Sequence, residues 1–204
     1  MSIKLVVGLG NPGKKYESTR HNAGFRLIER LAAQHRLSLR KEPRFHGLVA
    51  KFDTASGHAW LLLPQTWMNE SGSAVGALAR FHRIAADEML VAHDELDLPP
   101  GGVKIKQGGG HAGHNGLRDI IENLGTPDFW RLRIGIGHPR DLAASEQEVV
   151  DYVLHAPRKE EYALVDAAID RGVAAFDLIL ADNMAAAMHK LHTKPKPQTP
   201  DIPA

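Results

Sequence analysis

The 204-residue sequence contains no cysteine, which excludes disulfide bonds, thiolate nucleophiles and zinc sites built from cysteine. It also has no apolar run near the roughly 20 residues of a membrane-spanning helix, and its apolar start is too short for a signal peptide. The 25 basic and 24 acidic residues leave a net charge of +1, so a polyanionic partner would need a local cluster of basic side chains. We therefore expect a cytoplasmic protein with no membrane partner.

The segment VVGLGNPG, residues 6–13, has the G-x-G-x-x-G spacing of dinucleotide-binding loops. Such loops lead directly into a helix whose N-terminus holds the pyrophosphate. The residues that follow, KKYESTRHNAG, offer almost no apolar side chain for the buried face of a helix, and Glu29 lies inside a helical pattern instead of ending a second strand. The sequence thus disfavours dinucleotide binding and leaves the role of Asn11 open.

Short apolar segments alternate with helical patterns along the chain. We predict strands at residues 4–9, 45–52, 60–63, 89–93, 103–106 and 132–136, and helices at 24–35, 74–82, 116–124, 146–154 and 160–183, the last continuing towards 191. This order predicts an α/β fold, a single-domain sandwich with a mixed, mostly parallel sheet flanked by helices, in which GHAWLLLP closes an antiparallel hairpin. We expect the domain to span residues 1–192, followed by a disordered proline-rich tail over 193–204.

The unusual polar residues follow the predicted strands, where open α/β sheets bind ligands. They are Asn11, Asn69, His93, Asp94, His111, His114 and Asn115, with His21 just before the first predicted helix. Taken singly, these residues have structural explanations. Asn11 suits a turn before Pro-Gly, and Asn69 and Asn115 suit helix caps. Their shared location favours a site.

Histidine with a carboxylate is a general-base pair, and asparagine amides donate hydrogen bonds to a developing oxyanion. Because cysteine is absent and no serine lies in a G-x-S-x-G motif, the activated group is expected to be water. The residues therefore favour attack of water on an acyl carbon. His111 and His114 in HAGHN keep a metal site open as an alternative, although H-x-x-H lacks the i, i+4 spacing of helical zinc ligands.

Four long segments resemble those of bacterial peptidyl-tRNA hydrolases: VVGLGNPGKKYESTRHNAGF, PQTWMNESG, VAHDELDLPPGGVKIKQGGGHAGHNGLRDI and FWRLRIGIGHP. The resemblance runs from about residue 3 to beyond residue 152. It implies a monomeric α/β enzyme that needs no metal or other cofactor. Such an enzyme cleaves the ester between a peptide and the terminal ribose of tRNA, which recycles tRNA from chains dropped by the ribosome.

The resemblance also implies catalytic roles. His21 in TRHNAGF resembles the general base, and Asp94 in AHDELDLP resembles the carboxylate that orients it. Asn11 in GNPG resembles a substrate-contacting amide, and Asn69 in MNESG resembles the amide that binds the peptide and stabilises the oxyanion. Asn115 in GHNGL resembles the group that places the water and the tRNA end.

Further positions resemble substrate-binding residues of the family. Met68 lies beside Asn69 in the implied peptide groove, and His114 lies beside Asn115. Tyr16, Lys106 and Arg133 match positions associated with the acceptor end of tRNA.

The predicted strands offer a physical reason for RNA binding. Lys104 and Lys106 alternate along one strand and so share a face, as do Arg131 and Arg133 on another, and Arg118 would extend the patch. A solvated strand face explains the same pattern. A non-catalytic RNA-binding module and a metal-dependent hydrolase using His111, His114 and Asp94 therefore remain as rival functions.

Overall fold

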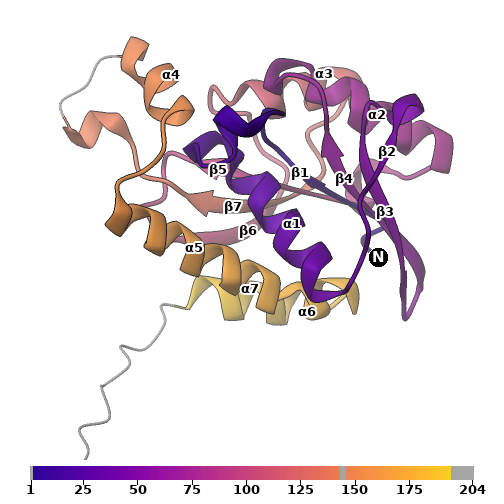
Figure 1. Cartoon of the computed structure of the whole chain (residues 1–204). Coiled ribbons are helices and arrows are strands. Elements are labelled where there is room, and N and C mark those ends of the chain that lie inside the picture. Colours follow the sequence, from indigo (N-terminus) through magenta and orange to yellow (C-terminus); the bar gives the residue numbers. More distant parts are fainter. Residues whose placement is uncertain (1, 143–145, 194–204) are drawn as a thin grey trace, which may run out of the picture.

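The computed structural model of the chain describes residues 2–142 and 146–193. Its sheet has the strand order β2-β3-β4-β1-β5-β7-β6 (Figure 1). The strands are β1 (Leu5–Gly8), β2 (Arg40–Glu42), β3 (Gly47–Thr54), β4 (Gly57–Pro64), β5 (Met89–Glu95), β6 (Val103–Gln107) and β7 (Trp130–Gly135). The helices are α1 (Ala23–Gln34), α2 (Ser71–His82), α3 (Asn115–Leu124), α4 (Glu146–Leu154), α5 (Lys159–Ala174), α6 (Phe176–Leu180) and α7 (Met184–His192).

The sheet is mixed, as predicted, and helices flank it. Strands β4, β1, β5 and β7 run parallel, whereas the β2–β3, β3–β4 and β6–β7 pairs are antiparallel. The expected predominance of parallel pairing is therefore limited to the four central strands. Because these four run the same way, their carboxyl ends meet at one edge of the sheet, where the candidate site lies.

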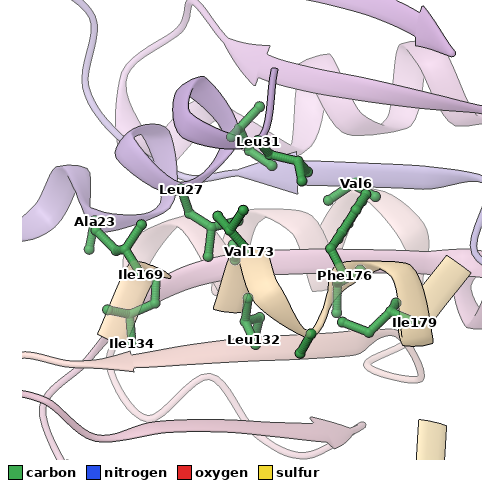
Figure 2. Close-up of a cluster of buried hydrophobic side chains, with 14 of the residues drawn as sticks. Val6, Ala23, Leu27, Leu31, Leu132, Ile134, Ile169, Val173, Phe176 and Ile179 are labelled. Atoms are coloured by element: carbon green, nitrogen blue, oxygen red, sulfur yellow. The ribbon is translucent and has the colours of Figure 1, made fainter. Parts of the chain in front are cut away.

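Alternating side chains of the strands supply two hydrophobic cores, one on each face of the sheet. Helices α1, α5, α6 and α7 cover one face, and α2 and α3 cover the other (Figure 1). Figure 2 shows part of the first core, where Leu27 of α1 and Val173 of α5 meet Leu132 of β7. On the other face, Val7 and Val91 pack with α2 and α3. The three layers form the predicted sandwich.

Two elements differ from the sequence-based prediction. β2 is short and charged, and it has no apolar pattern because it lies at the sheet edge, where backbone pairing with β3 forms it. The predicted helix over 160–183 is broken into α5 and α6, and its expected continuation towards 191 is a separate helix, α7. Asp182, with φ +58°, turns the chain between α6 and α7 so that Phe176 and Leu191 both reach the core. Tertiary packing decides these breaks, and a helical pattern in the sequence does not contain that information.

The predicted tail over 193–204 lies outside the described residues, apart from Thr193. Within the described residues, the helices are all too short or too polar to cross a bilayer.

Candidate active site

The centre of the candidate site is the carboxylate of Asp94, near the end of β5. Strand β5 is buried throughout because it lies between β1 and β7. Its alternation directs Leu90, Ala92 and Asp94 to the face covered by α1. His21 lies in a short 3-10 turn directly before α1, and its Nδ1 is 3.0 Å from both carboxylate oxygens of Asp94. The fold thus joins two groups 73 positions apart in the sequence.

The glycines around the first loop explain how α1 reaches the sheet so closely. A Cβ on Gly24 would lie 2.3 Å from the carbonyl oxygen of Ala92, and one on Gly8 would lie 2.4 Å from that of Gly24. Gly10 is packed in the same way against the ring of Phe25. These glycines therefore permit close packing between helix and strand. They bring His21 to Asp94. This packing accounts for the first two glycines of G-x-G-x-x-G, whereas Gly13 has open space around it and a positive φ of 105°.

Hydrogen bonds fix the proton positions on both histidines that contact Asp94. His114 caps α3, with its Nδ1 accepting the backbone N–H of Leu117 at 3.4 Å. Its Nε2 therefore carries the proton and donates to Asp94 Oδ1 at 3.0 Å. His21 likewise donates to the ionised carboxylate through Nδ1. In the neutral ring this leaves Nε2 of His21 as an unprotonated acceptor.

The pKa values follow from the same contacts. Burial alone would raise the pKa of Asp94, but its attraction to His21 and His114, with their hydrogen bonds, holds that pKa well below its usual range. Burial acts to lower the pKa of His21, yet Asp94 outweighs it and the pKa is raised. Asp94 thus stays ionised and makes His21 more basic.

A third histidine, His93, stays neutral beside this group. Burial, and next the neighbouring His114, lower the pKa of His93 to about 3. Its Nδ1 donates to the backbone carbonyl of Asp94 at 2.7 Å. Its ring lies nearly perpendicular to that of His114, with 5.2 Å between centroids. His93 therefore packs against the ring of His114 and adds no charge to the site.

Asn11 acts as a structural link, and its contacts are not those of a simple turn residue. Its Oδ1 accepts the backbone N–H of Met68 at 2.9 Å. The side chain of Asn22 bonds both backbone groups of Asn11, donating to the carbonyl and accepting from the N–H, each at 2.9 Å. The loop after β1 is thereby tied both to the turn that carries His21 and to the segment before Asn69.

Asn69 and Asn115 lie at the rim of the site and cap no helix there. The residue that precedes α2 is Glu70, and it makes no side-chain cap bond, whereas α3 is capped by His114. Both asparagines are exposed and line the same hollow as His21. Their amides are therefore available to a ligand.

A hollow of about 440 Å³ lies over these groups. Part of its apolar wall is formed by Tyr16, Trp67 and Met68. The rings of Tyr16 and Trp67 meet edge to face, with 5.8 Å between their centroids. Val150 and Val153 of α4 line it as well. The hollow combines an apolar wall with amide and imidazole groups, which suits a peptide-like ligand.

A second hollow, of about 330 Å³, adjoins the first, and His93 and Glu95 line both. Lys106 and Arg133 line the second hollow from β6 and β7, on the sheet face opposite α5 and α7. Arg133 Nε donates to Glu95 Oε2 at 2.8 Å. Burial, and next the charges of Arg133 and Arg131, lower the pKa of Lys106. Basic side chains are therefore gathered at this hollow. A polyanionic partner would need such a cluster, because the net charge of the chain is only +1.

Arg131 corrects the sequence-based interpretation of a solvent-facing basic strand. Its side chain is 1% exposed, and its guanidinium donates to the backbone carbonyls of Gly109 and Gly110. The metal alternative built on His111 is also not assembled, because His111 does not belong to the group of possible metal ligands that the described residues bring together, and its Nδ1 accepts the N–H of Gly113 within the loop. The metal-type cluster found among the described residues is His21, Asp94 and His114. Hydrogen bonds within this cluster already account for its close contacts.

Sequence reasoning gave no site role to Asn22 or Glu95, and it placed Arg131 in a basic patch for RNA although its side chain holds the glycine loop. Asn22 and Glu95 directly follow His21 and Asp94, and this adjacency was the available signal for both. Arg131 gave no such signal, because its pattern on the strand is the same as that of an exposed basic residue.

Comparisons with known proteins agree with this geometry. The family model described as peptidyl-tRNA hydrolase matches residues 5–199. The chain is 57% identical to a peptidyl-tRNA hydrolase of Bordetella avium, over 94% of this chain and 92% of that one, and 53% identical to one of Nitrosomonas europaea, over 95% and 97%. A crystal structure of peptidyl-tRNA hydrolase from Acinetobacter baumannii superimposes with a TM-score of 0.88 at 44% identity, covering 93% of this chain and 94% of that one. The chain belongs to the peptidyl-tRNA hydrolase family of enzymes.

Proposed function

We propose that this enzyme hydrolyses the ester bond between peptide and tRNA, using a water molecule activated by His21 and Asp94. The observation that carries the proposal is the orientation of His21. Its Nδ1 is bound to a carboxylate that stays ionised, so Nε2 is left to accept a proton beside the hollow. The raised pKa of His21 strengthens it as a base.

The reaction follows from this arrangement. Nε2 of His21 takes one proton from water as the water oxygen attacks the ester carbonyl carbon, which gives a tetrahedral oxyanion. Asp94 stabilises the imidazolium that forms. The intermediate collapses by breaking the bond to the ribose oxygen, which receives the proton from His21. The products are a free tRNA ready for reuse and a free peptide, whose new carboxylic acid keeps the second water proton and loses it to solvent to become a carboxylate.

The asparagines would stabilise the oxyanion and hold the peptide. Asn69 and Asn115 present exposed amides at the hollow. The Oδ1 of Asn11 is taken by Met68, so its amide N–H groups are the part that is left for substrate. Tyr16 and Met68 supply apolar contact for the peptide. An oxyanion donor contributes about 10²–10³-fold in rate.

The second hollow would hold RNA phosphate through Lys106 and Arg133. Arg133 uses Nε for Glu95, and its two terminal nitrogens make no hydrogen bond to the described residues, so these nitrogens are available. All proposed groups belong to one chain, so we infer that a monomer suffices. We also propose that the enzyme acts in the cytoplasm and needs no metal or cofactor.

Hydrolysis of purified peptidyl-tRNA in excess chelator tests the proposal. The unmodified chain should cleave at an unchanged rate, and His21→Ala should lose about 10²–10⁴-fold while keeping its affinity for tRNA. Loss of activity with chelator would favour a metal-dependent hydrolase. Binding without cleavage by the unmodified chain would favour an RNA-binding module. Near-normal turnover of folded His21→Ala would refute the role of this base.

A further inference from the structure

Arg131 is a buried cation that makes no ion pair with a carboxylate among the described residues. It lies on β7 opposite Lys106 of β6, on the face away from α5 and α7. Its guanidinium lies over the ring of Phe129 at 4.8 Å, and its Nε has no hydrogen-bond partner among the described residues. Burial, and next the charge of Arg133, lower its pKa. Burying a cation in this way is costly, so its remaining contacts must account for it.

Those contacts are with the glycine loop between β6 and α3. The terminal nitrogens of Arg131 donate to the carbonyl oxygens of Gly109 and Gly110. Apart from the contact of Asp94 with His114 at the end of the loop, these are the hydrogen bonds that a side chain outside the loop makes to it among the described residues. Gly109 and Gly110 belong to no helix or strand, so regular secondary structure does not hold the loop at this point.

The same loop delivers two site residues. At one end, the N–H of Gly108 donates to the carbonyl of Phe129, which fixes the loop to β7. At the other end, the loop runs into α3 at His114, whose Nε2 bonds Asp94, and Asn115 follows at once. Between these ends, the hydrogen bonds from Arg131 to Gly109 and Gly110 hold the loop.

We propose that Arg131 is a positioning residue, which holds the glycine loop so that His114 and Asn115 reach the reaction centre. The planar guanidinium presents two parallel N–H donors, which matches two successive carbonyls. This role differs from the phosphate binding proposed for Arg133 on the same strand face. It rests on the proposed hydrolysis, since its effect is read out through turnover.

Two variants separate this role from phosphate binding and from folding. Arg131→Met keeps an unbranched side chain but removes both donors. Arg131→Lys keeps the charge but offers a single ammonium in place of the fork. Arg133→Met is the matched control from the same strand, and all variants are first compared with the unmodified chain by circular dichroism and thermal melting.

Arg131→Met should lower kcat by about 10²-fold on peptidyl-tRNA and equally on a short peptidyl-ribonucleotide, with KM little changed, because misplacement by about 1 Å costs this much. Arg131→Lys should recover part of the loss. The slope of log KM against log salt should stay as in the unmodified chain, whereas Arg133→Met should flatten it by about 0.7–0.9. The ring ¹⁵N signals of His114 should shift in Arg131→Met and stay in place in Arg133→Met.

A flattened salt slope with kcat unchanged in Arg131→Met would overturn the proposal and make Arg131 a phosphate contact. Normal kinetics in a folded variant, or failure of both Arg131→Met and Arg131→Lys to fold, would overturn it as well, the latter by assigning Arg131 to the fold. If the unmodified chain cleaved no peptidyl-tRNA, the proposed function itself would fail, and the His114 signals would still report on the loop.

Discussion

Asn11 and Met68 are joined by a 2.9 Å hydrogen bond from the backbone N–H of Met68 to the side-chain Oδ1 of Asn11. The bond spans 57 positions of the chain and holds the segment with Asn69 against the loop after β1. Asn22 in turn holds the backbone of Asn11 and adjoins His21. The proposed base and the proposed oxyanion donor are therefore placed by one connected set of amide bonds.

Asn22→Ala should destabilise the protein through this set. It would leave the buried N–H and carbonyl of Asn11 without partners, which costs about 1–3 kcal/mol for each unsatisfied group. We expect a lower free energy of unfolding in urea denaturation and a smaller loss of turnover than in His21→Ala. Asn22→Asp keeps the acceptor and loses the donor, so its free energy of unfolding should lie between those of the unmodified chain and Asn22→Ala. Unfolding of Asn22→Ala at the unmodified midpoint would contradict this assignment.

Asp94→Asn should shift the pH dependence of hydrolysis. Asp94 raises the pKa of His21, so its removal lowers that pKa. Because the base acts unprotonated, the acidic limb of kcat/KM against pH should move to lower pH. The plateau rate should fall, towards the roughly 10⁴-fold loss known for the equivalent change in a Ser-His-Asp triad. An unmoved acidic limb would show that His21 is not the group that titrates.

Asn69→Ala should reduce turnover by about 10²-fold if this amide donates to the oxyanion. Asn69→Asp should be slower still, because a negative charge would face the developing negative charge. The residue is exposed and caps no helix, so thermal melting of both variants should stay close to that of the unmodified chain. Equal turnover of the two variants would leave no role for this amide in oxyanion stabilisation.

Combined Lys106→Ala and Arg133→Ala substitution should weaken tRNA binding and flatten the salt dependence of affinity by about one to two units of log slope. Each phosphate contact contributes about −0.7 on a single strand and about −0.9 on a duplex. Turnover at saturating substrate should change far less, and a short peptidyl-ribonucleotide should lose little.

Lys41→Ala with Lys51→Ala is the matched control for this pair, since it removes two exposed cations at the opposite edge of the sheet. It should leave the salt slope unchanged. An equal change in both double variants would assign the effect to overall charge and remove Lys106 and Arg133 from the RNA site.

The sequence by itself determined the fold class, the order of most elements and the polar residues at the strand ends. These follow from local information: apolar periodicity marks strands and helices, and Asp94, His21 and the asparagines stand out against apolar neighbours. The long motifs around them also sufficed to indicate the family.

The tertiary structure decided which of these groups meet. It broke the last predicted helix, because separate segments cover separate parts of the sheet, and it formed β2 by backbone pairing alone. It buried Arg131 against the glycine loop and left Arg133 partly exposed, although both alternate on the same strand and line the same hollow. Exposure depends on what packs over a strand face, and bonds such as Asn11 to Met68 join residues far apart in the chain, so neither can be derived from local pattern.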